Sequence, residues 1–338
     1  MAGLFQELQG AEARLYATSV IEELTVVYTA AQTRLRGLLA QNQSETARWR
    51  HEQLLSQVND QLRALDAAAR KWAATAIPGS FRAGGLDAAR ILESLDVTRA
   101  GTGFTQIQTR AVAALADQTV ADLLSANGTM KTQLTRYVRA VQGNAAMDQA
   151  ISRAIEQGLL EGASGRTINQ GVEQALRRSM GQEQFIVING RHYTPENYAA
   201  LVARTRTREA TTQGTVMTNL EFGNDLVQWD VHAGACPICQ THMGRVYSIS
   251  GSDPDFPMLE AKPPVHPHCL CNLFPAVKEI MKMRGTYDAM SELSQSSPSF
   301  QSEKDAQNWL NENPDRAINT LDDLNRWVVD YPMEAKRY

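Results

Sequence analysis

The chain has 338 residues, of which 43% are hydrophobic and 21% charged, and its formal net charge is −4. This composition is typical of a soluble protein and excludes a surface that is basic throughout, as a general nucleic-acid binder would need. No stretch approaches the ~20 apolar residues of a membrane span. The first residues lack the basic and apolar regions of a signal peptide, so we expect reduced thiols and metal ligation rather than disulfides for the four cysteines.

The first half of the chain carries apolar residues at helical spacing. Residues 24–39 and 55–72 show steps of three and four, which predict two long helices. The second is expected to stop at Ile77-Pro78-Gly79. Shorter helices are expected to follow near 86–96, 105–126, 130–142, 145–158 and 166–180, with Asn127-Gly128 as one of the breaks. We therefore predict a helical domain over residues 1–183.

At residue 185 the period changes. Phe185 to Ile188 and Arg191 to Tyr193 flank Asn189-Gly190, the sequence of a hairpin with a type I′ turn. Thr194-Pro195 then predicts a helix start, with threonine as N-cap. This helix carries Arg204, Arg206 and Arg208. Arginines at steps of two spread around a helix, so solvated charge is favoured over a phosphate or acidic-protein contact.

The last third alternates short strands, loops and helices. Strands are predicted over 225–231 and 245–249, a loop with five prolines over 253–267, and a helix after Phe274-Pro275 that runs to about Met283. The segment from Ser291 to Ser302 resembles a flexible linker, and two short helices are expected around Asn313-Pro314. The predicted fold is mainly α. It consists of a helical domain at 1–183, a small α+β zinc-stabilised domain at 184–285, a linker at 286–302 and a helical C-terminal tail at 303–338.

The cysteines form two close pairs in one Gly/Pro-rich stretch, Cys-x-x-Cys and Cys-x-Cys, and two histidines precede the second pair. Such spacing suits a tetrahedral zinc ion, because the Cys-x-x-Cys pair can bind it from a tight turn and the Cys-x-Cys pair from an extended segment. His268 falls on the opposite face of a strand from the cysteines and ranks below His266. His232 and His242 are expected to be surface or packing histidines. The candidate ligands, of which four would hold the ion, are Cys236, Cys239, His266, Cys269 and Cys271.

A site filled by four protein ligands is structural, because it leaves no open position for water. We expect zinc to stabilise a region with too few apolar residues to fold by itself. Loss of one thiolate should then unfold this region while the helical half stays folded. Glu260 is the only glutamate in the loop, and nothing places it near the metal. The sequence has no phosphate-binding Gly loop, nucleophile elbow, H-E-x-x-H or deaminase signature. We therefore expect no catalytic residues and no enzymatic activity.

Residues 193–275 resemble a known family in the order of their motifs. These are Tyr193-Thr194-Pro195, Arg204-Thr205, Asp225 to Trp229, Cys236-Pro237-Ile238-Cys239, Gly244 to Gly251, Phe256-Pro257 and His266 to Cys271. In this order they resemble the minor capsid (minor head) proteins of tailed bacteriophages, the family related to the Mu-type F head protein. That family typically ends in H-P-N-C-R-C or H-P-N-C-R-H, and here His268 and Leu270 replace Asn and Arg.

The resemblance implies a virion protein that is assembled in the bacterial cytoplasm and located in the capsid near the portal. It implies several copies per virion that contact the portal and major capsid proteins, with packaged DNA as a further contact and no membrane partner. The implied role is head morphogenesis or DNA packaging and delivery. Two alternatives stay open from the residues alone: a zinc-containing nuclease or hydrolase carried in the virion, and a cellular zinc module that binds nucleic acid.

Overall fold

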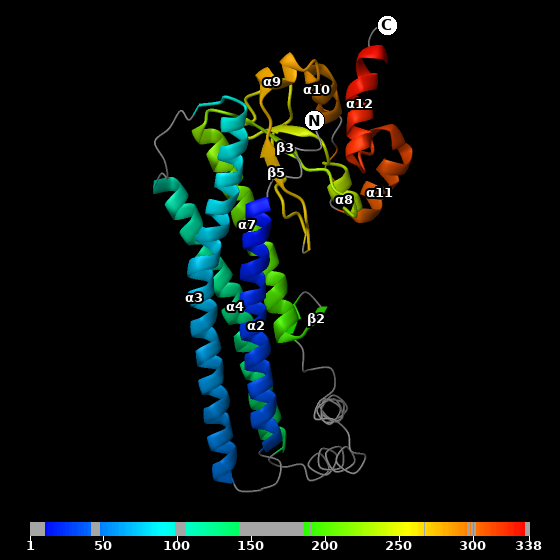
Figure 1. Ribbon diagram of the computed structural model, residues 1–338. Coiled ribbons are helices and arrows are strands. Elements are labelled where there is room, and N and C mark those ends of the chain that lie inside the picture. Colours follow the sequence, from blue (N-terminus) through cyan, green and yellow to red (C-terminus); the bar gives the residue numbers. More distant parts are fainter. Residues whose placement is uncertain are drawn as a thin grey trace. The chain divides into compact units, whose positions relative to one another are not determined.

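The computed structural model of the chain describes residues 11–41, 48–98, 106–141, 186–188, 191–266, 268–295, 298, 300 and 302–334. Within these residues the protein is mainly helical with a small three-stranded sheet (Figure 1), which confirms the predicted fold class. The helices expected at 145–158 and 166–180 lie outside the described residues.

Four long helices dominate the described residues, and each contributes residues to both compact units of the chain. The helices are α2 (Ala11–Gln41), α3 (Arg48–Ser94), α4 (Gln106–Val141) and α7 (Pro195–Glu221). The first unit comprises Met1–Ser19, Thr75–Ala116 and Arg204–Tyr338, and the second comprises Val20–Ala74 and Asp117–Ala203. The sequence placed its boundaries along the chain at 183, 285 and 302, and that division stays a prediction.

The second unit buries the apolar stripes that the sequence predicts. Its buried residues include Leu24, Tyr28, Val58, Leu62, Leu65, Ala69 and Trp72. The indole N–H of Trp72 donates to the carbonyl oxygen of Val20 at 2.7 Å, and the amide of Asn127 donates to Asp66 at 2.7 Å. These bonds connect α2 with α3 and α3 with α4 through polar groups inside the packed helices.

Two predicted helix ends do not occur. α3 continues through Pro78 to Ser94, and α4 continues through Asn127-Gly128 to Val141. A Cβ on Gly79 would lie 1.8 Å from the hydroxyl oxygen of Tyr16, so this glycine permits a close contact and does not end the helix. The neighbouring Ile77 and Phe81 are buried, and burial of such residues outweighs the low helix propensity of proline and glycine.

Within the first unit, α3 and α7 pack at very short range. A Cβ on Gly84 would lie 2.2 Å from the carbonyl oxygen of Thr211, and one on Gly214 would lie 2.0 Å from that of Phe81. The hydroxyl of Thr211 donates to the carbonyl oxygen of Thr207 at 2.9 Å, within α7. Glycines on both helices therefore let the two backbones touch.

Within the part of the chain that the structure describes, two small sheets accompany the helices. β1 (Ile186–Ile188) and β2 (Arg191–Tyr193) pair antiparallel, which confirms the predicted hairpin, although its turn residues lie outside the described part. Thr194 precedes α7, and its carbonyl accepts the backbone N–H of Tyr198 at 2.9 Å, as a helix start requires.

The second sheet has the order β4-β3-β5 and is antiparallel throughout. Its strands are β3 (Leu226–Trp229), β4 (Val246–Ser248) and β5 (Leu273–Pro275). Val227 on the central strand lies opposite Tyr247 and Pro275. β3 and β4 fall inside the predicted strands. The sequence did not predict β5, because a three-residue strand ending in proline has no detectable alternation.

The expectation that this region has too few apolar residues to fold is wrong. Val227, Trp229 and Met243 are fully buried in one cluster that also contains Cys239, Cys269 and Cys271. The cluster draws its apolar residues from segments far apart in sequence, including α7, the loop at 249–272 and the C-terminal helices. Local composition could not show this core, because each segment supplies only one or a few of its members.

Short helices follow β5, and they pack on the sheet, on the segment 237–240 and on one another. They are α9 (Lys278–Met283), α10 (Tyr287–Gln295), α11 (Glu303–Glu312), the 3-10 turn η2 (Pro314–Arg316) and α12 (Leu321–Glu334). α9 and the pair α11 and α12 confirm the predicted helices. α10 lies inside the range suggested as a linker and buries Met290 and Leu293, so this part of the range is packed helix.

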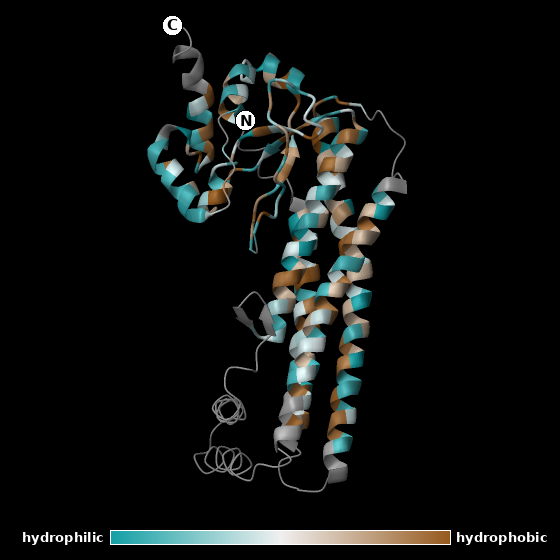
Figure 2. Ribbon diagram, turned by 180° about the vertical axis from the view of Figure 1, so that it is seen from behind, coloured by the Kyte–Doolittle hydropathy of each residue, from teal (hydrophilic) through white to brown (hydrophobic). Residues whose placement is uncertain are grey.

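No helix among the described residues combines the length and the apolar character that a membrane crossing needs. Hydrophilic and hydrophobic residues alternate along the long helices (Figure 2).

Candidate metal centre

The first cysteine pair is placed by a one-turn helix. β3 leads into a loop that ends at Cys236, the extended N-cap of α8 (Pro237–Gln240). Pro237 suits the first helical position, because its fixed φ matches the helix and no N–H is needed there. The backbone N–H of Gln240 donates to the carbonyl of Cys236 at 2.9 Å and closes the turn. Cys236 and Cys239 therefore lie on the same side of one helical turn.

The second pair is placed by a tight turn and by the sheet. The backbone N–H of Cys269 donates to the carbonyl of His266 at 3.1 Å. The intervening His268 has φ +68°, in the left-handed region. Cys271 follows shortly before β5, and the N–H of Asp230 donates to the carbonyl of Asn272 at 3.0 Å, beyond the last β3–β5 pair. The sheet thus brings Cys271 beside the loop that leads to Cys236.

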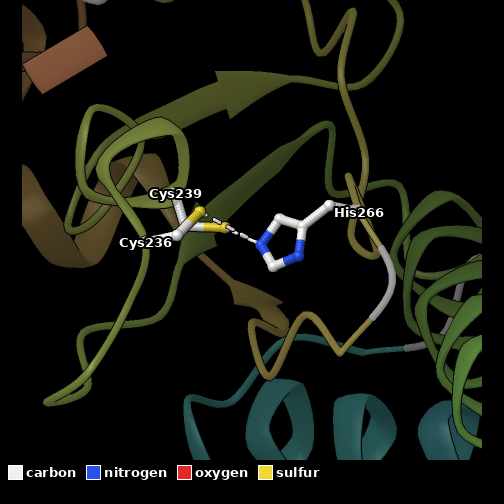
Figure 3. A group of neighbouring side chains, drawn as sticks. All are labelled: Cys236, Cys239 and His266. Atoms are coloured by element: carbon white, nitrogen blue, oxygen red, sulfur yellow. Dashed lines mark hydrogen bonds between the residues drawn. The ribbon is translucent and has the colours of Figure 1, made fainter. Parts of the chain in front are cut away.

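The five predicted ligands lie together. His266 directs Nε2 at both thiols of the first pair, 3.1 Å from Sγ of Cys236 and 3.2 Å from Sγ of Cys239 (Figure 3). Sγ of Cys239 lies 3.8 Å from Sγ of Cys269. Cys239, Cys269 and Cys271 form a second group whose sulfurs all lie within 4.8 Å of one another. Cys239 belongs to both groups and joins them.

These distances suit a tetrahedral ion. Zn–S bonds of about 2.3 Å and Zn–N bonds of about 2.0 Å separate two sulfurs by roughly 3.8 Å and a sulfur from a nitrogen by roughly 3.5 Å. The observed separations lie at or slightly below these values. Cys239 and Cys271 are 1% exposed and Cys269 is 6% exposed, whereas Cys236 and His266 are partly buried. The group can therefore hold a metal ion largely shielded from water.

The electrostatics of the thiols favour a cation. Hydrogen bonds from Cys239 and Cys271 lower the pKa of Cys269, and the bond to Cys269 together with burial raises the pKa of Cys239. Without a cation, the buried group stabilises one thiolate at the expense of its neighbours. A divalent ion would remove this competition, because its charge compensates several thiolates at once.

The other histidines have different surroundings. His268 is exposed, and its Nδ1 lies 3.1 Å from a guanidinium nitrogen of Arg204. His242 is buried, stacks on Trp229 with ring centroids 4.7 Å apart, and bonds the hydroxyl of Tyr247 at 2.7 Å. Burial lowers the pKa of His242 to about 4, so it is a neutral packing histidine, as the sequence suggested.

Asp230 is absent from the ligands predicted from the sequence, and His232 is expected there to be a surface or packing histidine. His232 directs Nε2 at Sγ of Cys271 from 3.3 Å, and the carboxylate of Asp230 completes a third group with them. Burial raises the pKa of Asp230 to about 6. The sequence pattern that could have indicated this pair is Asp-x-His at the end of a predicted strand, where residues two apart share a face.

The sequence also did not predict the hydrogen bonds of Arg208. This guanidinium donates to the backbone carbonyl of Leu270 at 3.1 Å and to the side-chain oxygen of Asn272 at 2.6 Å. Burial lowers its pKa. The prediction of solvated charge is therefore wrong for Arg208, whereas Arg206 pairs with Glu209 at 2.7 Å within α7. The spacing of the arginines along a helix could not reveal a bond to a loop more than 60 residues away.

Residues 16–259 match the family described as phage minor capsid protein 2. The chain belongs to this family. The matched range contains the first cysteine pair of the minor capsid protein and ends before His266, so the second half of the metal centre lies beyond it. The more specific relation to the Mu-type F head protein is not confirmed. No curated protein and no solved structure matches the minor capsid protein. Family membership indicates a structural role in the capsid, and hence a location in the virion.

Proposed function

We propose that this minor capsid protein acts at the portal vertex of a tailed-phage head, where it contacts the portal and major capsid proteins. There it assists head morphogenesis or the packaging and delivery of DNA. The observation that carries the proposal is the family match over most of the chain. The long helices support it, because they offer extended surfaces for docking on neighbouring subunits.

We propose further that the metal is a structural zinc ion held by Cys236, Cys239, His266 and Cys269. His266 Nε2 faces two of these sulfurs, and the third lies 3.8 Å from Cys239. Three thiolates and one imidazole fill the tetrahedral shell of zinc and leave no position for a substrate. Cys271, the fifth candidate, adjoins this set through Cys239 and Cys269.

The ion would connect two segments that are about 30 residues apart in sequence. One is the turn of α8, and the other is the approach to β5. Both already contact the apolar core, so the metal's role is to fix the turns at its surface. Such a site stabilises a docking surface, because it limits local opening of the loops that carry it.

The alternative of a virion-carried nuclease or hydrolase requires a reacting group open to solvent. In the described part of the chain, three of the four cysteines are buried and His266 belongs to the proposed metal shell, whereas His268 is exposed beside Arg204. A plasmid-degradation assay with added Mg²⁺ tests this alternative directly, and strand cleavage that is lost on mutation of His266 would support it.

The decisive experiment for the proposed function uses phage particles. An amber mutation in the gene should yield heads with defective assembly or defective DNA content. Cross-linking of wild-type particles should join this chain to the portal and shell proteins, in several copies per particle. Normal, fully infectious heads that lack the chain would overturn the proposal. Zinc measured on the purified protein tests the metal separately.

A further inference from the structure

The third group of side chains, Asp230, His232 and Cys271, lies directly beside the proposed zinc site. Their ligand atoms all lie within 4.8 Å of one another, and Cys271 also belongs to the group with Cys239 and Cys269. A carboxylate oxygen, an imidazole nitrogen and a thiolate sulfur are the three donor types that zinc accepts. The proposed four-ligand shell uses neither Asp230, His232 nor Cys271.

The orientation of His232 suits a metal ligand. Its Nδ1 lies 3.2 Å from the carbonyl oxygen of Ala233, and a carbonyl only accepts hydrogen bonds. In the tautomer that donates from Nδ1 to this carbonyl, Nε2 presents a lone pair toward Cys271. Metal-bound histidines commonly show this arrangement, with the outer nitrogen bonded to a backbone carbonyl.

Asp230 supplies an independent observation. Only 8% of its surface is exposed, and its Oδ1 has no hydrogen-bond partner. A buried carboxylate oxygen without a donor is costly, and such an orphan commonly marks an ion-binding position. Its backbone is fixed by the bond to Asn272, so the carboxylate is held next to Cys271.

We propose that Asp230, His232 and Cys271 hold a second Zn²⁺, which makes a two-metal cluster with the zinc site proposed above. This inference rests on that proposed site, because the two groups adjoin through Cys271. A shared thiolate or a water supplies the fourth position of the second ion. Formal charges agree with two ions: four thiolates and one carboxylate carry five negative charges, and two divalent cations together with Arg208 carry five positive ones.

The competing role for His232 is a hydrogen-bond partner of Cys271 that touches no metal. In that arrangement the thiol of Cys271 donates to Nε2, and the chain holds one zinc ion only. The two roles therefore differ in metal stoichiometry, which can be measured without any assay of activity.

The test is elemental analysis of the purified full-length protein after equilibration with Zn²⁺ and removal of unbound ions. We expect two zinc ions per chain in the wild type and one in His232→Ala and Asp230→Asn. The control His268→Ala should keep both ions, because this histidine is exposed and contacts Arg204. Titration of the metal-free wild type with Co²⁺ should show two binding steps by thiolate charge-transfer absorption, which guards against variants that misfold.

Each outcome decides a separate point. One zinc ion in the wild type and in His232→Ala would overturn the second site and leave the first intact. No zinc in the wild type would overturn both sites. Two ions retained by both His232→Ala and Asp230→Asn would show that other residues hold the second ion, and the assignment would fall.

Discussion

Arg208 donates a 2.6 Å hydrogen bond to the side-chain oxygen of Asn272, the residue that follows Cys271. The same guanidinium nitrogen reaches the carbonyl of Leu270, on the other side of that cysteine. α7 thereby holds both neighbours of one metal-site thiol. The position of Cys271 depends on this contact as well as on the β3–β5 pairing.

Replacing Arg208 by Met should lower the free energy of unfolding by about 2 kcal/mol, because two bonds from a charged donor are lost while the side-chain stem still packs. Zinc affinity should fall as well. Urea unfolding of the zinc-loaded protein measures the first effect, and competition with a chromophoric chelator measures the second. Arg204→Met is the matched control on the same helix, and its exposed contact should contribute about 0.5 kcal/mol or less. Equal losses in the two variants would contradict a special role for Arg208.

Gly214→Ala should destabilise the protein by about 1–3 kcal/mol, because the added methyl group would meet the carbonyl oxygen of Phe81 and force α3 and α7 apart. Gly128→Ala is the control. It is also helical but faces open space, so it should stabilise by about 0.5–1 kcal/mol through helix propensity. Thermal unfolding followed by circular dichroism gives both signs, and a stabilised Gly214→Ala would show that the helices are less closely packed.

The buried His242 should make stability depend on pH. Its pKa is lowered from 6.5 to about 4 in the folded protein, so unfolding takes up a proton between these values. The stabilisation is complete above pH 6.5 and is lost as pH falls toward 4, by up to about 3 kcal/mol.

His242→Gln tests this, since glutamine can still bond Tyr247 but does not titrate. The stability advantage of the wild type over the variant should shrink steadily from pH 7 to pH 4, as measured by denaturant unfolding at each pH. Acid effects on the metal ligands are common to both proteins and cancel in the comparison. A constant difference across this range would mean that His242 takes up no proton on unfolding.

Removing the metal should weaken the region around β3, β4 and β5 without unfolding the helices of Val20–Ala74 and Asp117–Ala203. Free zinc at a thousand times its dissociation constant stabilises by about 4 kcal/mol. At about 2–4 °C per kcal/mol, a chelator should lower Tm by roughly 10 °C. Because Trp229 and Val227 are fully buried in an apolar cluster, the chelated region should remain partly ordered. Calorimetry with and without chelator measures the shift, and an unchanged melting curve would refute a structural metal.

The sequence alone determined those features that depend on neighbouring residues. The helical stripe through Leu24 and Tyr28, the N-cap at Thr194 and the paired cysteines each follow from local periodicity or spacing. For the same reason, the sequence identified the five residues as candidate metal ligands, since thiols and imidazoles at short intervals suit one ion.

Only the tertiary structure decided where those residues meet. α3 continues through Pro78 because Ile77 and Phe81 are buried, and this burial outweighs the local helix-breaking signal. The core around Trp229 draws its members from distant segments, and Arg208 reaches a loop more than 60 residues away. Hydrophobic burial and hydrogen bonding act between groups that are close in space, whatever their separation along the chain. A sequence pattern shows only the separation along the chain.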